Sequence, residues 1–578
     1  MESKNGRNLR RFQEAKVPPK NRWFKSILIQ LGLVLLSALL FTGSFPNLLI
    51  ENGLPLLAWF AYLPVLLLIK NNSPLQCAGW GAIYGLAAYS LFNYWLSAFH
   101  PLAGTIVYSI YIVYLAAVFL LLKLADIFFP RRAYLVQWLI WLAYEFLRTK
   151  GFLGYSYGIT GYSQWRVIPL IQIASITGVW GVCALVTFPS FAIAQALRNR
   201  PGFSEIGLAN NGLVNNGRAI IGPIADFVKK ERLPVILWAI ALAAALIFGF
   251  TANRDFSSYP TANIALVQQN TDPWKATKAP TQYQIIQAYR KDLQTLKRLS
   301  DEALASTPKP DMVVWAETAF VPRIYWHTTY RDDQDTWLLV RELLDYLHGK
   351  DVPFLIGNDD ARMDMAKNPD PLEKFRVDYN AALLFENGEL TETYRKIHLV
   401  PFTEHFPYKK QFPFIYDALK KQDTHFWEKG DTYTVFRGPG FAFSTPICFE
   451  DTFGYLSRNF VRAGADLLVN ISNDAWAESL PSQNQHLSMA VFRAVENNRS
   501  MVRSSSSGQT CAIDPRGRIT AMAGPFTETW LNVTVPIVKK DTFYTLHGDY
   551  LALIFSFTAV ILLISGAGWC IIRKLKRG

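Results

Sequence analysis

Long apolar runs limit the fold of this chain more than any other feature of its sequence. Seven of them lie before residue 253, and an eighth extends from about Tyr550 to Ile572. A helix needs roughly 20 apolar residues to cross the ~30 Å hydrocarbon layer of a bilayer, and these runs reach or approach that length. Their approximate limits are 26–44, 52–69, 77–98, 103–129, 134–148, 168–197, 234–252 and 550–572. The sequence therefore predicts a polytopic α-helical membrane domain with about eight transmembrane helices.

Lysine and arginine gather beside the apolar runs and give the chain a formal net charge of +13. Cytoplasmic loops of membrane proteins are enriched in these two residues. With the N-terminus inside, the basic clusters fall on the cytoplasmic side: the tail 1–25, Lys70, Arg131 and Arg132, the loop 198–233 and the tail 573–577. We therefore expect residues 253–548 to lie outside the cytoplasm. This distribution accounts for the positive charge without a nucleic-acid partner.

A different pattern fills the interval between the last two spans. Short β-like runs alternate there with longer amphipathic stretches, which is typical of a layered α/β domain. The β-like runs are 263–267, 312–315, 353–356 and 466–469, and the helix candidates are 280–304, 333–348, 452–463 and 483–498. We divide the chain into a basic cytoplasmic tail (1–25), a seven-helix membrane domain (26–252), an extracytoplasmic α/β domain (253–548) and a C-terminal helix with a basic cytoplasmic tail (549–578).

Three reactive side chains lie just after β-like runs, where strands commonly present side chains to a pocket. Glu317 follows the run 312–315, Lys396 lies in the segment 394–404, and Cys448 lies in the segment 443–451. Taken singly, each has an ordinary explanation, because a lone cysteine in an apolar run is usually a small core residue and single charges are usually solvated. Together they supply a thiol, a base and a cation, which is what an activated cysteine nucleophile requires.

The sequence predicts no metal site and no other cofactor. The five cysteines are scattered, and none of them forms a pair with zinc-ligand spacing. His398 and His405 flank Glu404, but no second cluster of ligands accompanies them.

The three reactive segments resemble the Glu-Lys-Cys triad of the nitrilase superfamily and, within it, the apolipoprotein N-acyltransferases. Further stretches that are similar to this family are Asn470–Trp476, Pro481–Arg499, Leu153–Tyr155, Gly161–Gln164 and Ile173–Val182. The likeness therefore covers both the membrane half and the α/β half. Ala316, Phe449 and the run 504–507 differ from residues that are common in the family, and none of these differences removes a triad residue.

The resemblance implies a fold and roles for individual residues. The α/β part would be a nitrilase-like α-β-β-α sandwich. Cys448 would be the nucleophile, Glu317 the base, and Lys396 the cation that stabilises the oxyanion together with the backbone N–H of Phe449. Glu404 and Glu450 would orient Lys396 or Glu317. Aromatic side chains would keep water out of the pocket or contact acyl chains, Trp476 and Trp274 among them.

The resemblance also implies a reaction. A membrane phospholipid would donate an acyl chain to Cys448, and the resulting thioester would acylate the α-amine of a diacylglyceryl-apolipoprotein, the last step of lipoprotein maturation. The enzyme would act as a monomer in a bacterial inner membrane, with its catalytic domain facing the periplasm. The alternative is a membrane-anchored amidase with the same triad, although one span would be enough for an anchor. A lipid or lipoprotein binder without activity and a transporter are less consistent with an intact triad and few intramembrane charges.

Overall fold

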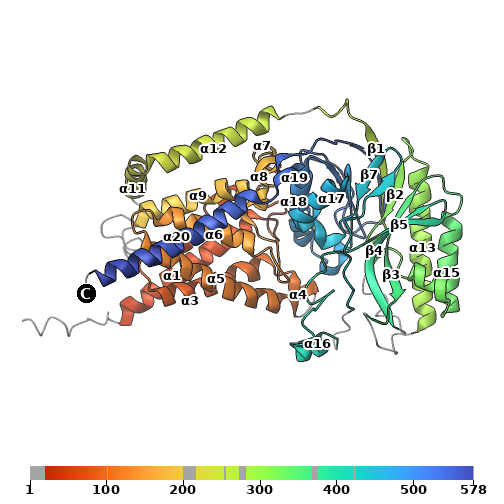
Figure 1. Ribbon diagram of the computed structural model, residues 1–578, viewed down its shortest axis with the longest axis horizontal. Coiled ribbons are helices and arrows are strands. Elements are labelled where there is room, and N and C mark those ends of the chain that lie inside the picture. Colours follow the sequence, from red (N-terminus) through yellow and green to blue (C-terminus); the bar gives the residue numbers. More distant parts are fainter. Residues whose placement is uncertain are drawn as a thin grey trace, which may run out of the picture.

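The computed structural model describes residues 20–99, 102–198, 217–252, 255–271, 281–366, 375–420 and 425–576. An elongated bundle of apolar helices forms one half of the molecule, and an α/β domain forms the other (Figure 1). The C-terminal helix α20 (Tyr550–Leu575) runs back from the α/β domain along the bundle, where it contacts α5 and α6. The two ends of the α/β domain are thus both joined to helices of the bundle.

The bundle contains long helices and several short ones. The long helices are α1 (Lys20–Ser44), α3 (Pro74–Phe92), α5 (Ala103–Phe128), α6 (Ala133–Leu147), α9 (Val179–Arg198), α11 (Gly217–Lys230) and α12 (Arg232–Thr251). The short ones are η2 (Pro55–Trp59), α2 (Leu63–Leu66), η3 (Leu67–Ile69), α4 (Leu96–Phe99), η4 (Thr160–Gln164), α7 (Ile168–Ile171) and α8 (Ala174–Thr177).

Five helices in the described part of the chain are long and apolar enough to cross a membrane. They are Phe24–Ser44, Leu102–Phe128, Val179–Arg198, Arg232–Thr251 and Tyr550–Leu575. The run predicted at 52–69 is instead divided into η2, α2 and η3, with prolines near the starts of the first two, because proline lacks the N–H that a helix interior needs. The run predicted at 168–197 is also divided. It begins with the short helices α7 and α8, and Gly178, whose φ is 64°, separates them from α9. The number of spans therefore stays a prediction.

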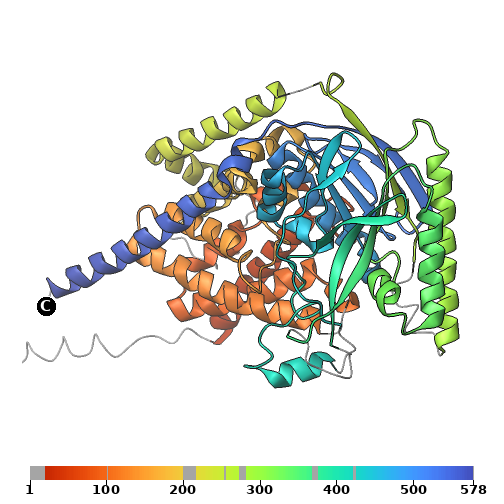
Figure 2. The same ribbon diagram turned by 45° about the vertical axis from the view of Figure 1, so that its right-hand side comes forward.

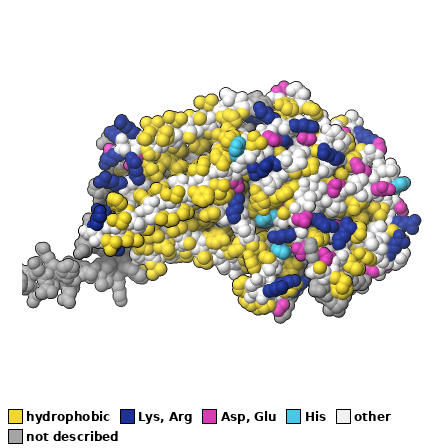
Figure 3. All heavy atoms as spheres, in the orientation of Figure 1, with side chains coloured by type: hydrophobic (Ala, Val, Ile, Leu, Met, Phe, Trp, Pro, Cys, Tyr) yellow, Lys and Arg dark blue, Asp and Glu magenta, His cyan; other side chains and the backbone are white. Residues whose placement is uncertain are grey.

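The surface of the bundle agrees with a membrane environment. Hydrophobic side chains cover most of its visible face, and Lys and Arg side chains gather at the end distant from the α/β domain (Figure 3). The α/β half shows charges of both signs mixed with apolar atoms on the same view. Exposed leucine, isoleucine and phenylalanine side chains of α12 and α20 contribute to the apolar surface. A surface this apolar is expected to contact lipid.

Two six-stranded sheets make up the core of the α/β domain. The first has the order β12-β1-β2-β3-β4-β5 and the second the order β11-β10-β9-β8-β7-β6. The strands are β1 (Thr261–Gln268), β2 (Met312–Trp315), β3 (Phe354–Met363), β4 (Arg376–Glu386), β5 (Glu389–Arg395), β6 (Phe436–Gly438), β7 (Phe441–Ser444), β8 (Leu467–Ser472), β9 (Ser500–Ser505), β10 (Cys511–Ile513), β11 (Ile519–Met522) and β12 (Thr529–Pro536). In each sheet three neighbouring strands are parallel and the flanking pairs are antiparallel.

Helices cover the outer faces of both sheets, so the predicted α-β-β-α sandwich is confirmed. On the first sheet lie α13 (Gln282–Leu304) and α15 (Gln334–Leu347), and on the second lie α17 (Gly454–Ala463) and α18 (Leu480–Asn497), which face the bundle (Figure 1; Figure 2). Strand β2 shows how the layers divide its side chains. Val313 and Trp315 pack with the helices, whereas Met312 and Val314 pack in the core shared with the second sheet.

Candidate active site

Three strand ends bring the predicted triad together. Glu317 lies two residues after β2, and Lys396 directly follows β5. Cys448 follows β7 and begins the short helix η7 (Cys448–Thr452). The ammonium nitrogen of Lys396 is 3.4 Å from Oε1 of Glu317. Cys448 keeps partial exposure, and the charges of both partners act on its thiol. Residues from both sheets therefore meet at one site.

The turn that carries Cys448 has an unusual backbone. Its φ of 49° lies in the left-handed region, which costs a residue with a side chain of the order of 1 kcal/mol or more. Asn470 of β8 supports this turn, because its Nδ2 donates to the carbonyl oxygens of Pro446 at 2.9 Å and Cys448 at 3.3 Å. Strained, well-supported backbone of this kind is common where a reactive group must be held in place.

Hydrogen bonds orient the Glu317 carboxylate on both oxygens. Asn380 of β4 donates to Oε1 at 2.8 Å, and the backbone N–H of Asn473 donates to Oε2 at 2.9 Å. With Lys396 beside Oε1, the carboxylate is held by three groups while remaining next to the thiol. This arrangement suits a base that must accept a proton from a fixed direction.

Lys396 is completely buried between two carboxylates. Its Nζ is 2.8 Å from Oε1 of Glu404 and 3.4 Å from Oε1 of Glu317. Burial alone would lower the Lys396 pKa, but the carboxylates of Glu404 and Glu317 outweigh it and raise that pKa. The side chain is therefore an ammonium ion at neutral pH. Glu404 is itself fixed, because the backbone N–H of Val400 donates to its Oε2 at 2.8 Å.

Glu450 joins the nucleophile turn to the end of β5. Its carboxylate accepts hydrogen bonds from the backbone N–H groups of Ile397 at 2.8 Å, His398 at 2.9 Å and Ile447 at 2.8 Å. The hydroxyl of Tyr394 also donates to it at 2.8 Å. Burial raises the pKa of Glu450 to about 7, against the effect of these donors. Glu450 thus acts on the backbone next to Lys396 and Cys448.

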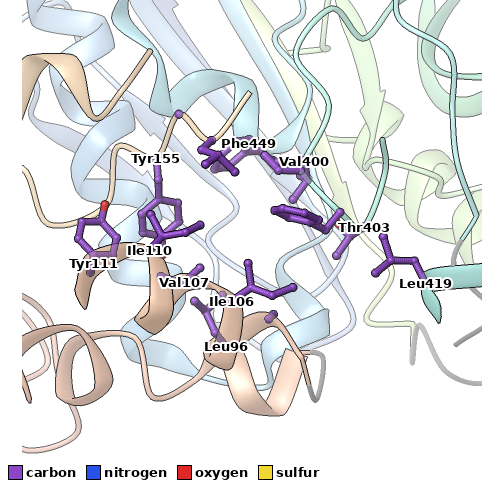
Figure 4. Close-up of a pocket in the computed structure, with 15 residues that line it drawn as sticks. Leu96, Ile106, Val107, Ile110, Tyr111, Tyr155, Val400, Thr403, Leu419 and Phe449 are labelled. Atoms are coloured by element: carbon purple, nitrogen blue, oxygen red, sulfur yellow. The ribbon is translucent and has the colours of Figure 1, made fainter. Parts of the chain in front are cut away.

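An apolar cavity lies next to the nucleophile turn, where Phe449 forms part of its wall. The empty space between its walls, counted together with its open mouth, is about 780 Å³. The lining includes Phe449 and the loop 400–403 of the α/β domain, the loop 153–155, and one face of α5 in the bundle (Figure 4). Figure 4 shows Phe449 and Val400 across from Ile106 and Leu96, with Tyr111 at one end and Leu419 at the other. A candidate membrane helix therefore forms one wall of a cavity whose opposite wall carries the residue next to the thiol.

Two of the aromatic residues singled out in the sequence cannot be placed in this cavity. Trp274 lies outside the described residues, and for Trp476 only the backbone, in η8 (Asp474–Ala477), is described. Sequence reasoning missed Asn380, although a polar residue before the apolar run 381–385 of a buried strand was a usable signal. It also missed the cavity wall formed by α5, because the sequence of an apolar helix face does not show whether that face contacts lipid, protein or a cavity.

Comparison with known proteins agrees with both halves of the fold. Residues 263–539 match the carbon-nitrogen hydrolase family, and residues 37–192 match the apolipoprotein N-acyltransferase N-terminal domain. Among solved structures, a carbon-nitrogen hydrolase from Helicobacter pylori is 13% identical with a TM-score of 0.35, covering 50% of this chain and 94% of that one.

Two relatives extend over almost the full length of the chain. Apolipoprotein N-acyltransferase 1 of Treponema denticola is 43% identical over 561 residues, which cover 95% of this chain and 98% of that protein. Apolipoprotein N-acyltransferase 1 of Treponema pallidum is 46% identical over 562 residues, covering 96% and 99%. Identity at this level across both the helical bundle and the α/β sandwich shows that the chain belongs to the apolipoprotein N-acyltransferase family.

Proposed function

We propose that this acyltransferase takes an acyl group from a membrane phospholipid onto Cys448 and passes it to the α-amine of the diacylglyceryl-cysteine of an apolipoprotein. One observation carries the proposal. Phe449, the residue after the nucleophile, lines an apolar cavity that is walled by the catalytic domain on one side and by the candidate membrane helix α5 on the other. A lipid acyl chain in this cavity would therefore lie next to the turn that carries the thiol. A small-amide hydrolase has no need of such a cavity.

The first half-reaction forms a thioester. Burial, and then the charge of Glu317, raise the pKa of the Cys448 thiol, while Lys396 opposes them, so the thiol is protonated at rest. As sulfur attacks the ester carbonyl, Glu317 accepts the thiol proton. Lys396 and the backbone N–H of Phe449 stabilise the oxyanion. The ester C–O bond then breaks, Glu317 returns the proton to the departing alkoxide, and a lysophospholipid leaves.

The second half-reaction releases the enzyme. The neutral α-amine of the apolipoprotein attacks the thioester carbonyl, and Glu317 accepts the proton that the amine loses. The C–S bond breaks, sulfur leaves, and the proton returns to it as the thiol is restored. The product is an amide. Water competes with the amine in this step, and the apolar lining of the cavity next to Phe449 keeps its concentration low.

The orientation in the membrane belongs to the same proposal. The membrane domain comprises residues 26–252 and the C-terminal helix that begins near residue 549, and the catalytic domain 253–548 faces the periplasm from a bacterial inner membrane. The two family matches support these boundaries, because 37–192 and 263–539 each fall inside one domain. The Lys and Arg side chains at the far end of the bundle support a cytoplasmic location for that end (Figure 3). We propose that a single copy is sufficient, since all three triad residues come from one chain.

The direct test is acyl transfer by the purified full-length protein in phospholipid micelles. With a synthetic diacylglyceryl-cysteine peptide, mass spectrometry should show one added acyl chain on the peptide and one lysophospholipid for each. The same peptide with its α-amine acetylated should not react. The Cys448→Ala variant should be inactive, whereas Cys77→Ala, which removes a buried thiol from the bundle, should remain active. Hydrolysis of small amides without any acyl transfer would support the amidase instead.

A further inference from the structure

Four buried charged side chains form a closed ring behind the nucleophile turn. His486 of α18 lies between two carboxylates, with Nε2 2.6 Å from Oδ1 of Asp451 and Nδ1 3.0 Å from Oδ1 of Asp474. Arg503 of β9 contacts the second oxygen of Asp451 and is 3.4 Å from Oδ2 of Asp474. Each of the four side chains is at most 8% exposed. The ring plays no part in the two half-reactions described above.

The contacts define the charge of the histidine. An ionised carboxylate can only accept hydrogen bonds. An imidazole with a carboxylate oxygen at each of its nitrogens must therefore donate from both nitrogens. Only the imidazolium form does so. Burial opposes this charge, but Asp451 and Asp474 outweigh burial and Arg503, and they raise the pKa of His486 to about 9. The ring then holds two cations and two anions, which balance.

The ring connects the two parts of the site that must stay aligned. Asp451 lies in η7, three residues after Cys448. Asp474 directly follows Asn473, whose N–H holds the Glu317 carboxylate. The hydroxyl of Ser472 also donates to Oδ1 of Asp474 at 2.8 Å, so this loop is fixed from both sides. His486 therefore contacts both the turn that carries Cys448 and the loop that orients Glu317.

Helix α18 is in turn fixed against the bundle by the residue before His486. The Gln485 side chain donates to the carbonyl oxygens of Pro46 at 2.9 Å and Phe92 at 3.3 Å. It also accepts a hydrogen bond from Nε1 of Trp95 at 3.1 Å. Both the bundle and the catalytic turns are thus held by neighbouring residues of one helix.

We propose that His486 is a positioning residue that acts as an imidazolium, neutralising Asp451 and Asp474 and holding the Cys448 turn beside Glu317 so that sulfur can carry negative charge during acylation. The inference rests on the proposed function in taking Cys448 as the nucleophile. No proton leaves His486 in the reaction. Burial and Glu317 chiefly raise the pKa of the Cys448 thiol, and Asp474 adds to them, so the balance of charge in the ring is felt at sulfur.

Two other titratable groups, Tyr157 and Cys511, lie near this cluster. The ring of Tyr157 is centred 6.3 Å from that of His486, and the buried Cys511 thiol lies close enough to Arg503 to affect its pKa. Burial raises the pKa of both the Tyr157 phenol and the Cys511 thiol, so both are neutral at the pH of the experiment below. The variable charges of the ring are therefore those of His486, Asp451, Asp474 and Arg503.

The test measures the rate of Cys448 alkylation by iodoacetamide at pH 7, mapped by peptide mass spectrometry on the full-length protein. At this pH His486 is an imidazolium and the Cys448 thiol is mostly protonated, so the rate follows the small fraction of thiolate. His486→Gln leaves the ring with one uncompensated negative charge, and the rate should fall about tenfold, the effect of a rise of one unit in the Cys448 pKa. Asp451→Asn leaves one uncompensated positive charge, so its rate should rise. The double variant restores balance and should return near the wild-type rate. His547→Gln, the same change at an exposed histidine, should leave the rate unchanged.

A purely structural role predicts another outcome. It would lower thermal stability in both single variants and would leave the two alkylation rates unchanged or changed in one direction, which would overturn the proposal. If one single variant does not fold, the direction of the change in the other still decides. The alkylation assay uses neither phospholipid nor lipoprotein. Opposite changes in rate without any acylation of the wild-type enzyme would therefore uphold the ring while rejecting the proposed donor.

Discussion

At the residue scale, each member of the triad depends on polar neighbours that the triad pattern does not contain. Asn380 and the N–H of Asn473 hold the Glu317 carboxylate, Glu404 holds the Lys396 ammonium, and Asn470 supports the Cys448 turn. These partners fix the positions from which the reaction starts. Lys396 is paired with Glu317, and Cys448 is a neutral thiol beside them.

A histidine next to the triad gives the protein a stability that depends on pH. His398 packs against Phe453 with ring centroids 4.0 Å apart, and its Nδ1 is 2.8 Å from the Tyr455 hydroxyl. Burial, then Lys429 and Lys396, lower its pKa to about 3. A histidine in the unfolded chain titrates near ~6.5. Between these values the unfolded state binds the proton and the folded state does not, so stability falls as the pH falls from about 6.5 toward 3.

We expect His398→Gln to remove this part of the acid sensitivity. At pH 5 the wild-type free energy of unfolding should be lower by about 2 kcal/mol because of this histidine. The figure follows because pH 5 lies about one and a half units below the histidine pKa in the unfolded chain. Thermal unfolding in detergent at pH 7 and pH 5 measures it, with His547→Gln as the control. The melting temperature of His398→Gln should fall less between the two pH values than those of the wild type and the control. Equal decreases in all three proteins would show that His398 is not the group concerned.

The family resemblance implied that the triad, Glu404, Glu450 and Phe449 belong to one site, and the structure brings all six together. Their roles in the reaction stay predictions. The Asp451–His486 contact could not be predicted, because it joins residues 35 apart in the sequence through packing of η7 against α18. A pattern within one segment does not encode such a contact.

At the element scale, the site is made by turns at the ends of strands. The clearest case is the close approach of β3 to the turn after β2. Gly357 of β3 has no side chain, and a Cβ there would overlap the carbonyl oxygen of Ala316 and lie 2.7 Å from Cα of Glu317 and from N of Thr318. These are backbone atoms, so they can yield only if the turn that carries Glu317 moves.

Gly357→Ala should therefore reduce catalysis more than stability. Overpacking of this kind typically costs about 1–3 kcal/mol of stability. A displacement of the base by about 1 Å can cost on the order of a hundredfold in rate. Single-turnover acylation of Cys448 and the melting temperature measure the two effects. Gly524→Ala is the matched control, since the nearest atoms to its Cβ are at 3.6 Å. A Gly357→Ala enzyme as fast as this control would contradict the account of the turn.

The predicted elements of the α/β domain are confirmed where the local pattern was strong. The runs 263–267, 312–315, 353–356 and 466–469 lie in or overlap β1, β2, β3 and β8, and the four helix candidates correspond to α13, α15, α17 and α18. The hairpin of β4 and β5 was missed, although Asn387-Gly388, both at positive φ, is a typical hairpin turn. The segment 55–69 is divided into three short helices. Hydropathy therefore predicts how long an apolar run is, but not whether the run forms one continuous helix.

At the scale of the whole molecule, the bundle and the sandwich share one apolar cavity, so neither half forms that cavity alone. Phe152 of the bundle half also packs against Phe402 and Tyr408 of the catalytic half, with ring centroids 5.2 and 5.4 Å away. The proposed orientation of this unit in the membrane rests on the distribution of charge and on the predicted number of spans. It can be tested without reference to the reaction.

We expect the catalytic domain and the C-terminal end of α20 to lie on opposite sides of the inner membrane. In a Cys448→Ala background, a cysteine placed at the exposed Asp351 should react with a membrane-impermeant maleimide in intact spheroplasts. A cysteine at the exposed Lys574 should react only after the membrane is permeabilised. The reverse labelling pattern would mean that the number of spans before residue 253 is even, with the catalytic domain in the cytoplasm.

In the proposed reaction Cys448 carries the acyl group between two lipids, and the mass of the enzyme shows whether it does. Incubated with a phospholipid of defined acyl chains and no acceptor, the full-length protein should gain the mass of one acyl group, released by hydroxylamine and mapped to the peptide that contains Cys448. Glu317→Gln should form this adduct about 10²–10⁴ times more slowly and still fold, because Lys396 keeps Glu404 as its partner. An enzyme that transfers acyl chains to the lipopeptide without ever carrying one on Cys448 would contradict the account.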